Sequence, residues 1–219
     1  TPPSFVSTPL LTLQNHPLPL PVSAQAMDAL LPQTQCRQCG FDGCAAYAQA
    51  IAQGLAPINR CAPGGARGIA KLARATGLPE TALDPEFGRE VPFAVAHVRA
   101  ADCIGCGWCA KACPTDAIAG APKHLHGVIA ERCTGCALCA PACPMDCIDF
   151  VETGAAWTDE DARRAKRLFE ETWARRVKRR AQEDARLKAL RADAGAAQAL
   201  ERKNFLADIM ALARKRAQK

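Results

Sequence analysis

The strongest constraint on the fold of this chain is a run of four cysteines and a proline that occurs twice. The run has the spacing C-x2-C-x2-C-x3-C-P and spans residues 103–114, and it returns 30 residues later at residues 133–144. Asp116 and Asp146 occupy equivalent positions behind the two runs. A repeat of this kind indicates a duplicated half-domain.

The spacing within each run is typical of domains that bind two [4Fe–4S] clusters. Three thiolates within seven residues can hold three irons of one cubane, while the proline turn carries the fourth cysteine to the other cluster. Structural zinc, the alternative, usually takes C-x2-C pairs that are separated by a longer loop. We therefore predict crossed ligation, with one cluster on Cys103, Cys106, Cys109 and Cys143 and the other on Cys133, Cys136, Cys139 and Cys113. Clusters shared in this way tie the two halves together and serve as the core of a small domain.

A further set of four cysteines lies upstream, at Cys36, Cys39, Cys44 and Cys61. Four thiolates suffice for a [4Fe–4S] cluster or for zinc, and this spacing is only moderately specific for the cluster. The two clusters predicted downstream favour iron–sulfur here as well. One cysteine remains, Cys147, and we expect it to be a buried packing thiol because twelve cysteines already complete three sites.

Charge divides the chain into a body and a tail. Residues 158–219 contain 18 Lys+Arg and 10 Asp+Glu, a net charge of +8, whereas the rest contains 10 and 12, a net charge of −2. All 13 cysteines lie in the body, and their odd number argues against a closed disulfide framework. The sequence shows no run of 18 apolar residues and no secretory signal, so we expect a reducing cytoplasm, where clustered thiols usually bind metal.

The body is expected to contain short elements between the cysteines. Residues 1–22 hold six prolines and favour an extended or disordered arm. Residues 23–66 form the four-cysteine module, with a helix capped by Ser23 and a second helix that Gly54 ends. Residues 67–92 read as a linker with one short helix, and residues 93–152 as the two-cluster domain, which opens on a short strand.

Residues 153–219 are predicted to form a basic helical tail. Thr158 and the three acidic residues behind it are typical of a helix start. The helix is expected to run to about Ala192, with a break at Gly195 and a second amphipathic segment over 197–217. We consider a solvated, ion-paired helix, docking on an acidic partner, and peripheral contact with a membrane surface; nucleic acid is a weaker interpretation, because no binding motif accompanies the charge.

Several motifs of enzymes are missing from the sequence. It has no G-x-G-x-x-G after a strand, no P-loop and no nucleophile elbow, so we expect no nucleotide, no catalytic residues and no substrate site of its own. Trp108 and Leu138 are expected to shield the clusters from water or to pack in the core. His124 and His126 are expected to lie on the surface or to be satisfied by hydrogen bonds.

Two motifs upstream of the double run carry a resemblance to a known family. They are L-L-P-Q-T-Q-C-x-x-C-G-x-x-G-C at residues 30–44 and I-N-x-C-x-P-G-G at residues 58–65. They resemble the four-cysteine iron–sulfur module of RnfB, a subunit of the Rnf/Rsx-type ion-translocating electron transport complex. The double run, with C-P-M-D-C-I at residues 143–148, is similar to the two-cluster ferredoxin domain of the same subunit.

The resemblance covers about residues 23–152 and both modules in the same order. It implies that Cys36, Cys39, Cys44 and Cys61 hold a third [4Fe–4S] cluster, and that the chain relays low-potential electrons on the cytoplasmic side of a membrane complex. Members of the family typically begin with a membrane-anchoring helix, whereas this sequence begins with the proline-rich segment. The resemblance does not extend to the basic tail.

We therefore expect an α+β protein with a small helical iron–sulfur module, a two-cluster ferredoxin-like domain with short antiparallel strands, and a long C-terminal helical tail. The expected function is electron transfer through three [4Fe–4S] clusters, as a subunit of an Rnf-like complex with redox protein partners. The alternatives are a free soluble polyferredoxin and a nucleic-acid or scaffold protein with structural clusters. The expected location is the cytoplasm or the cytoplasmic face of the inner membrane.

Overall fold

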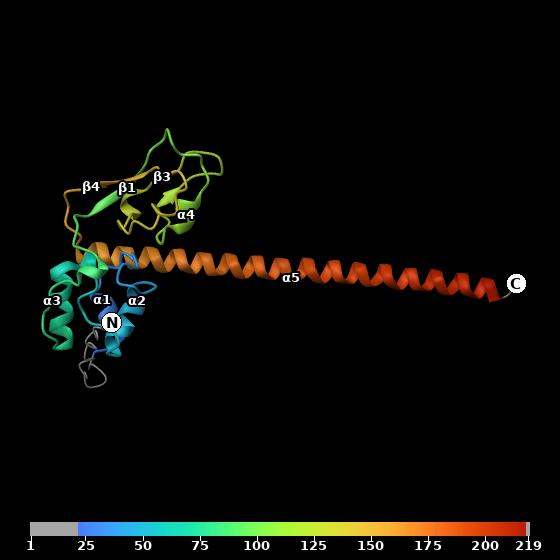
Figure 1. Cartoon of the computed structure of the whole chain (residues 1–219), viewed down its shortest axis with the longest axis horizontal. Coiled ribbons are helices and arrows are strands. Elements are labelled where there is room, and N and C mark those ends of the chain that lie inside the picture. Colours follow the sequence, from blue (N-terminus) through green and yellow to red (C-terminus); the bar gives the residue numbers. More distant parts are fainter. Residues whose placement is uncertain (1–21, 218–219) are drawn as a thin grey trace, which may run out of the picture. The chain divides into compact units, whose positions relative to one another are not determined.

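A computed structural model of the chain describes residues 22–217. The predicted proline-rich arm lies outside the described residues except for Val22. The chain divides into two units, residues 1–169 and residues 170–219. Short helices, short antiparallel strands and one long C-terminal helix make up the fold, as the sequence predicts (Figure 1).

Three helices build the four-cysteine module. They are α1 (Ala24–Leu30), α2 (Cys44–Ala52) and α3 (Gly65–Thr76). The 3-10 turn η1 (Ala62–Gly64) precedes α3, and a second one, η2 (Pro85–Phe87), follows it in the chain. Ser23 caps α1 as predicted, because its hydroxyl accepts a hydrogen bond of 3.2 Å from the Ala26 amide. Gly77 ends α3 in the left-handed conformation that helix C-termini favour.

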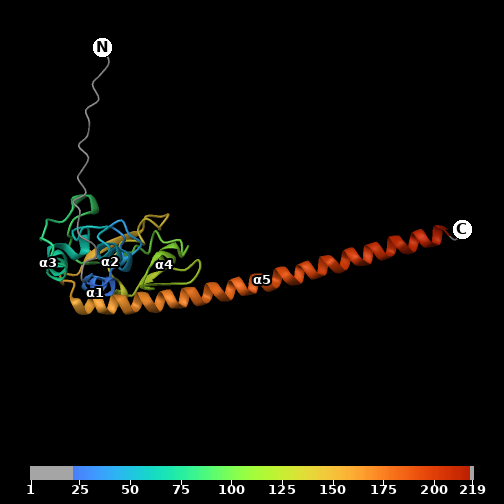
Figure 2. The ribbon, with the colours of Figure 1, turned by 90° about the horizontal axis from the view of Figure 1, so that it is seen from below.

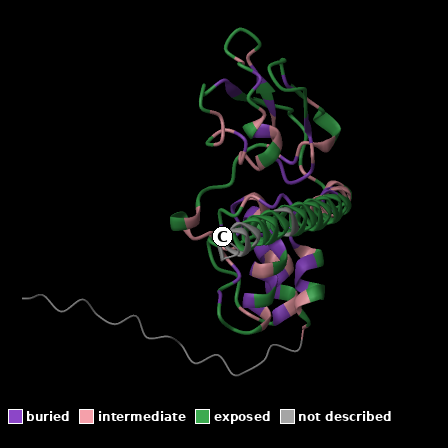
Figure 3. Cartoon of the chain, turned by 90° about the vertical axis from the view of Figure 1, so that its right-hand side faces the viewer, coloured by how far each residue is buried: buried purple, intermediate pink, exposed green. Residues whose placement is uncertain are grey.

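The core of the module is apolar and draws on all three helices. Met27, Tyr47, Ile51 and Leu72 are almost completely buried there, and buried residues recur along these helices in Figure 3. The short helix expected within residues 67–92 is present as α3, and its apolar residues, which repeat at helical spacing, are buried in this core.

The two-cluster domain has two small antiparallel pairings. Strand β1 (Ala94–Val98) pairs with β4 (Ile148–Glu152), and β2 (Ile118–Ala119) pairs with β3 (Gly127–Val128). The short helix α4 (Trp108–Ala112) and the turn η3 (Ala130–Arg132) complete the domain. The strand predicted at residues 93–99 is confirmed as β1.

Backbone hydrogen bonds at the ends of these pairings repeat with the duplication. The Arg99 amide donates to the Cys147 carbonyl at 2.9 Å, and the Ile129 amide donates to the Ala117 carbonyl at 2.7 Å. Arg99 and Ile129 precede the two cysteine runs by the same number of residues, and Ala117 and Cys147 follow them likewise. Each pairing thus returns the end of one run to the start of the other, which is the chain path that crossed ligation requires.

The two modules of the first unit touch through their ligand loops. The buried hydroxyl of Thr134 donates to the Thr34 carbonyl at 3.1 Å. The Trp157 indole donates to the Pro32 carbonyl at 2.9 Å, and its ring lies 4.7 Å from the ring of Phe93. Thr34 and Thr134 each lie within two residues of a cysteine of their own set, so these two cysteine sets are neighbours.

The long helix α5 (Asp159–Ala217) begins as predicted from its first residues. The Thr158 hydroxyl accepts from the Asp161 amide at 3.2 Å, and the Asp161 carboxylate accepts from the Thr158 amide at 2.9 Å, a reciprocal cap. Lys166, in the part of α5 that belongs to the first unit, forms an ion pair of 2.6 Å with Asp28 of α1. Lys71 of α3 pairs with Asp159.

The helix continues without the break predicted at Gly195, and it includes the segment over 197–217 that we expected to be separate (Figure 2). It has 59 residues, a length of about 90 Å at 1.5 Å per residue. One interior glycine costs only about 1 kcal/mol relative to alanine, which a long run of good helix formers on both sides outweighs. From Val177 to Met210 every described side chain is exposed. No helix in the described part of the chain is both long and apolar enough to span a membrane.

Candidate iron–sulfur centres

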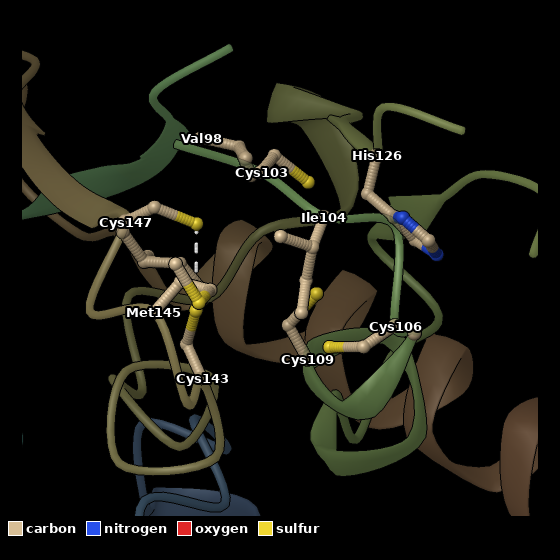
Figure 4. A pocket seen from close by; sticks show the side chains of 11 residues that line it. Val98, Cys103, Ile104, Cys106, Cys109, His126, Cys143, Met145 and Cys147 are labelled. Carbon is tan, nitrogen blue, oxygen red and sulfur yellow. Dashed lines mark hydrogen bonds between the residues drawn. The ribbon is translucent and has the colours of Figure 1, made fainter. Parts of the chain in front are cut away.

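The first predicted set of four cysteines gathers at one cavity of the two-cluster domain. Cys103 and Cys106 come from the loop before α4, Cys109 comes from α4 itself, and Cys143 comes from the second run. Their side chains point toward one another in Figure 4, with Cys147 beside them. Cys106 is exposed and Cys109 is buried, so the cavity opens to solvent on one side.

The second predicted set gathers at another cavity. Cys133, Cys136 and Cys139 line it together with Cys113 from the other run. Thr115 connects the runs at this point: its hydroxyl donates to the Arg132 carbonyl at 2.7 Å, and the Arg132 side chain donates to the Thr115 carbonyl at 3.1 Å. The structure therefore brings together the two crossed sets that the spacing predicts.

The chemistry of the lining fits an iron–sulfur cluster. Each of the two cavities is lined by four of the predicted cysteines, three from one run and one from the other. Four thiolates are the donor set that a [4Fe–4S] cluster requires.

Equivalent glycines shape both ligand loops. Gly105 and Gly135 have φ values of +68° and +65°, which glycine adopts readily. A Cβ at Gly105 would lie 2.5 Å from the His124 nitrogen, and a Cβ at Gly135 would lie 2.8 Å from the Ala94 carbonyl oxygen. Only glycine therefore allows each ligand loop to lie this close to the neighbouring backbone segment of the same domain while its cysteines point inward.

Backbone amides donate hydrogen bonds to the sulfurs of the two crossing ligands. The Ala117 amide donates to Cys113 Sγ at 3.2 Å, and the Cys147 amide makes the equivalent bond in the second half. Burial opposes the Cys143 thiolate, but hydrogen bonds from the backbone and side chain of Cys147 hold the pKa of Cys143 below its ordinary value. Thiolate is the form that ligates iron, so these bonds prepare the ligand and would tune the cluster.

Cys147 is buried, as predicted, but it also contacts a proposed ligand. Its Sγ lies 3.4 Å from Cys143 Sγ, as the dashed line in Figure 4 marks. Burial and the hydrogen bond with Cys143 raise the pKa of Cys147 to about 12, so Cys147 remains a thiol and donates to its neighbour. The equivalent residue in the first half is Ala117, so only the second half has a thiol that donates to its crossing ligand.

The four cysteines of the first module lie beside its apolar core. Cys39, Cys44 and Cys61 are buried and Cys36 is partly exposed, and Cys61 interacts electrostatically with the other three. Burial raises the pKa of Cys44 to about 12 and raises the pKa of Cys61 well above its ordinary value. Without a positive centre these thiols stay protonated, so metal binding has to displace their protons.

A buried polar network, which we did not predict from the sequence, supports the first ligand loop. Asp28 accepts a hydrogen bond of 2.9 Å from the Gln33 side chain, and the Gln33 side chain accepts one of 3.0 Å from the Gln35 side chain. Oε1 of the Gln35 side chain accepts one of 3.0 Å from the Cys44 backbone amide. Gln33 and Gln35 have φ values of +58° and +57°, which cost side-chain-bearing residues roughly 1–2 kcal/mol each. A Cβ at Gly43 would lie 2.6 Å from Gln35 Oε1. The only signal in the sequence is the polar run Q-T-Q directly before the first cysteine.

Replacing Gln35 with alanine should loosen this loop. The buried Cys44 amide would lose its partner, which costs about 1–3 kcal/mol and corresponds to a roughly 5- to 150-fold faster loss of the cluster. The measurement is the bleaching of visible absorbance by an iron chelator under anaerobic conditions. Gln38→Ala, at an exposed position of the same loop, is the matched control and should bleach at the wild-type rate. Equal rates for both variants would show that the network does not support the cluster.

The neighbours of the clusters differ from one another in burial. Trp108 is 56% exposed and has Lys111 Nζ 4.8 Å from its ring centroid, so it does not pack in the core. Leu138, at the equivalent position, is half-buried.

The two histidines of the ferredoxin domain differ in exposure. His124 is exposed, and its Nδ1 is 3.0 Å from the Pro122 carbonyl. His126 is buried against the first cavity, with Nδ1 3.1 Å from the His124 carbonyl. The prediction for the two histidines is confirmed.

Comparison with known families agrees with the two modules. Residues 96–150 match the family described as "4Fe-4S dicluster domain", and residues 31–63 match the family described as "Putative Fe-S cluster". The fold and the cysteine cavities thus define an iron–sulfur protein of the ferredoxin type, with a second iron–sulfur module in front of its dicluster domain.

Curated relatives give a more specific assignment. The chain is 53% identical over 108 residues to the RnfB subunit of the ion-translocating oxidoreductase complex of Thiobacillus denitrificans, and 56% identical over 103 residues to that of Azoarcus sp.. These matches cover 49% and 47% of this chain and 57% and 56% of the relatives, so the chain spans just over half of their length. It is also 56% identical over 132 residues to the RnfB subunit of Stutzerimonas stutzeri, which covers 60% of this chain and 68% of that relative. The chain belongs to the RnfB family of the ion-translocating oxidoreductase complex.

Proposed function

We propose that this chain carries electrons through three [4Fe–4S] clusters as a subunit of an ion-translocating oxidoreductase complex. Each cluster would supply one-electron chemistry, at a potential that burial and hydrogen bonds to its sulfurs adjust. The observation that carries the proposal is the pair of cavities that are each lined by three cysteines of one run and one of the other. A shared ligand set of this kind supports two clusters held within one small domain.

The third cluster of the proposal lies on Cys36, Cys39, Cys44 and Cys61. Its support is the burial of three of these side chains, the electrostatic interaction of Cys61 with the other three, and the family match over residues 31–63. The bond between Thr134 and Thr34 joins this set to the set of Cys133, Cys136, Cys139 and Cys113. Electron transfer rates fall steeply with distance, so adjoining ligand loops favour transfer between these two sites.

Electron counting tests the redox part of the proposal. The anaerobically reconstituted chain should take up about three electrons, one for each cubane, in a coulometric titration followed by EPR spectroscopy. The measured iron content should be about twelve atoms per chain, with an equal amount of acid-labile sulfide. Clusters that remain oxidised at low potential would favour the structural interpretation of a scaffold protein, and zinc without sulfide would contradict the proposal outright.

Membership of the complex is tested in cells. The relatives are named as subunits of an ion-translocating complex, and we propose that this chain likewise works at the cytoplasmic face of a membrane with membrane-embedded redox subunits as partners. Anaerobic purification of the tagged protein from crosslinked cells, read by mass spectrometry, should recover such subunits. Recovery of soluble oxidoreductases alone would favour a free polyferredoxin, and recovery of nucleic-acid proteins a structural role.

A further inference from the structure

One arginine of the four-cysteine module has no counter-charge among the residues that the structure describes. Arg60 directly precedes Cys61 and is partly buried. Its Nε is buried without a hydrogen-bond partner, and its guanidinium forms no ion pair with a described residue. A charge that leaves water is costly unless an opposite charge lies close to it. The neighbouring cysteines can supply that charge, because a cubane with four thiolate ligands is negative.

Three contacts determine where the Arg60 side chain lies. The Arg60 amide donates to the Tyr47 hydroxyl at 3.0 Å, which ties its backbone to the core of the module. The guanidinium carbon lies 4.4 Å from the centroid of the Phe87 ring, so the charge rests on an aromatic face. A Cβ at Gly40 would lie 3.4 Å from Phe87 Cε1. Phe87 therefore contacts both the guanidinium and the turn that directly follows Cys39.

Phe87 is held in place by hydrogen bonds on both sides of it in the chain. On one side, the Asp84 amide donates to the Asn59 carbonyl at 2.9 Å. On the other side, the Glu90 carboxylate accepts a hydrogen bond of 3.2 Å from the Ala66 amide at the start of α3. Asn59 and Ala66 lie before and after the last cysteine of the module in the sequence. The segment is thus tied across this ligand loop, which keeps the ring against the guanidinium.

The charge of Arg60 acts on the cysteine set. Burial raises the pKa of the Cys39 thiol, and the positive charge of Arg60 is among the influences that lower it. Asp28 acts on Cys44 with the opposite sign, but its ion pair with Lys166 offsets its charge. Arginine keeps its charge at every physiological pH, and charges interact strongly where little water separates them. A [4Fe–4S] cluster gains one negative charge on reduction, so a nearby positive charge stabilises the reduced form more than the oxidised form.

The cluster concerned is the one proposed on Cys36, Cys39, Cys44 and Cys61, which we call the first-module cluster. We infer that Arg60, held against Phe87, is the counter-charge of this cluster and raises its reduction potential. The inference rests on the proposed function, because it assigns Arg60 a role at one of the three proposed clusters. Arg60 binds no iron in this role. It makes the transfer of an electron to the first-module cluster more favourable.

Potentiometry followed by EPR spectroscopy tests the inference on the full-length chain, reconstituted anaerobically. Cys36→Ala should lack the reduction wave of the first-module cluster, which identifies that wave in the wild-type titration. In Arg60→Gln the equilibrium constant for reduction of this cluster should fall about tenfold or more, a shift of the wave by about 59 mV to lower potential. Arg60→Lys keeps the charge and should recover more than half of this shift. Phe87→Ala frees the guanidinium to move into water, so the wave should shift in the same direction by a smaller amount.

A matched variant and the other two clusters serve as controls. Arg74→Gln removes an exposed arginine of α3 in the same module and should leave all waves in place. The waves of the two ferredoxin-domain clusters should not move in any of these arginine variants. An unchanged first-module wave in either Arg60→Gln or Phe87→Ala, or equal shifts in Arg60→Lys and Arg60→Gln, would overturn the inference. Phe87→Ala decides the question alone if Arg60→Gln fails to hold its cluster. Wild-type clusters that cannot be reduced would instead overturn the proposed function itself.

Discussion

Replacing Cys143 and Cys106 together with alanine should leave about eight of about twelve iron atoms per chain, whereas replacing Cys143 and Cys136 together should leave about four. The first pair belongs to one cavity although its members come from different runs, and the second pair belongs to one run although its members line different cavities. The difference arises because a cubane that loses one thiolate ligand is already unstable. A second lesion at the same cluster therefore removes nothing further, whereas a lesion at the other cluster removes four more irons.

Iron and acid-labile sulfide are the quantities to measure, on protein reconstituted and purified anaerobically. If each run instead held its own cluster, the two double variants would exchange their values, with about four irons for Cys143→Ala/Cys106→Ala and about eight for the other. This exchange makes the experiment a direct test of crossed ligation.

Cys147→Ala is the control for the loss of a cysteine near the cavity of Cys103, Cys106, Cys109 and Cys143. Its sulfur lies 3.4 Å from Cys143 Sγ, so it is the nearest thiol that we do not propose as a ligand. The variant should retain about twelve irons per chain. Loss of about four irons would make Cys147 a ligand and would contradict the ligand set proposed here.

Removal of iron should unfold the ferredoxin domain and leave much of the four-cysteine module folded. The core of residues 93–152 consists of nine buried residues, four of which are cysteines, and the others are alanine, valine and isoleucine. Such a core buries too little apolar surface to hold a domain of this size without its clusters. Amide hydrogen exchange in β1, β4 and α4 should therefore accelerate by about two orders of magnitude or more after chelation.

The four-cysteine module provides the internal comparison. Met27, Tyr47, Ile51 and Leu72 give it a larger apolar core, and the Tyr47 hydroxyl is satisfied by the Pro57 carbonyl at 2.8 Å and the Arg60 amide at 3.0 Å. Burial raises the pKa of Cys44 to about 12, so at neutral pH the freed thiol is uncharged and tolerates burial. The centres of α2 and α3 should keep part of their protection after chelation.

Hydrogen exchange with mass spectrometry on the same sample reports both modules at once, with the cluster-loaded chain as reference. Equal loss of protection in both modules would show that the first core also depends on its cluster. Full retention of protection in residues 93–152 would contradict the role of the clusters as the core of that domain.

Local signals in the sequence predicted the local structure well. Ser23 and Thr158 start helices because a hydroxyl before an apolar or acidic turn satisfies the first free amides, and this depends on neighbouring residues only. The break predicted at Gly195 is wrong for a related reason: glycine weakens a helix by a small, local amount, and the favourable residues on both sides outweigh it. The helix expected within residues 67–92 forms as α3, but the burial of its apolar face depends on distant parts of the module, so the sequence did not predict it.

The buried network of Asp28, Gln33 and Gln35 lay beyond the reach of sequence reasoning. Each of these residues is ordinarily exposed, and polar residues are buried only where partners satisfy them. The partners here include the Cys44 amide, and Lys166 pairs with Asp28 from far along the chain. Only the folded chain brings these groups together.

Spacing in the sequence was enough to predict which cysteines meet at the two cavities of the ferredoxin domain, because three ligands lie within seven residues and the repeat places the fourth. It could not predict how the duplicated loops differ in exposure, since Ile104 and Thr134 occupy equivalent positions. That difference comes from a contact across 100 residues, in which Thr134 binds the Thr34 carbonyl and nothing in the described chain covers Ile104 in the same way. Spacing along the chain sets the ligands, whereas burial depends on which distant surfaces pack together, and this is visible only in the folded chain.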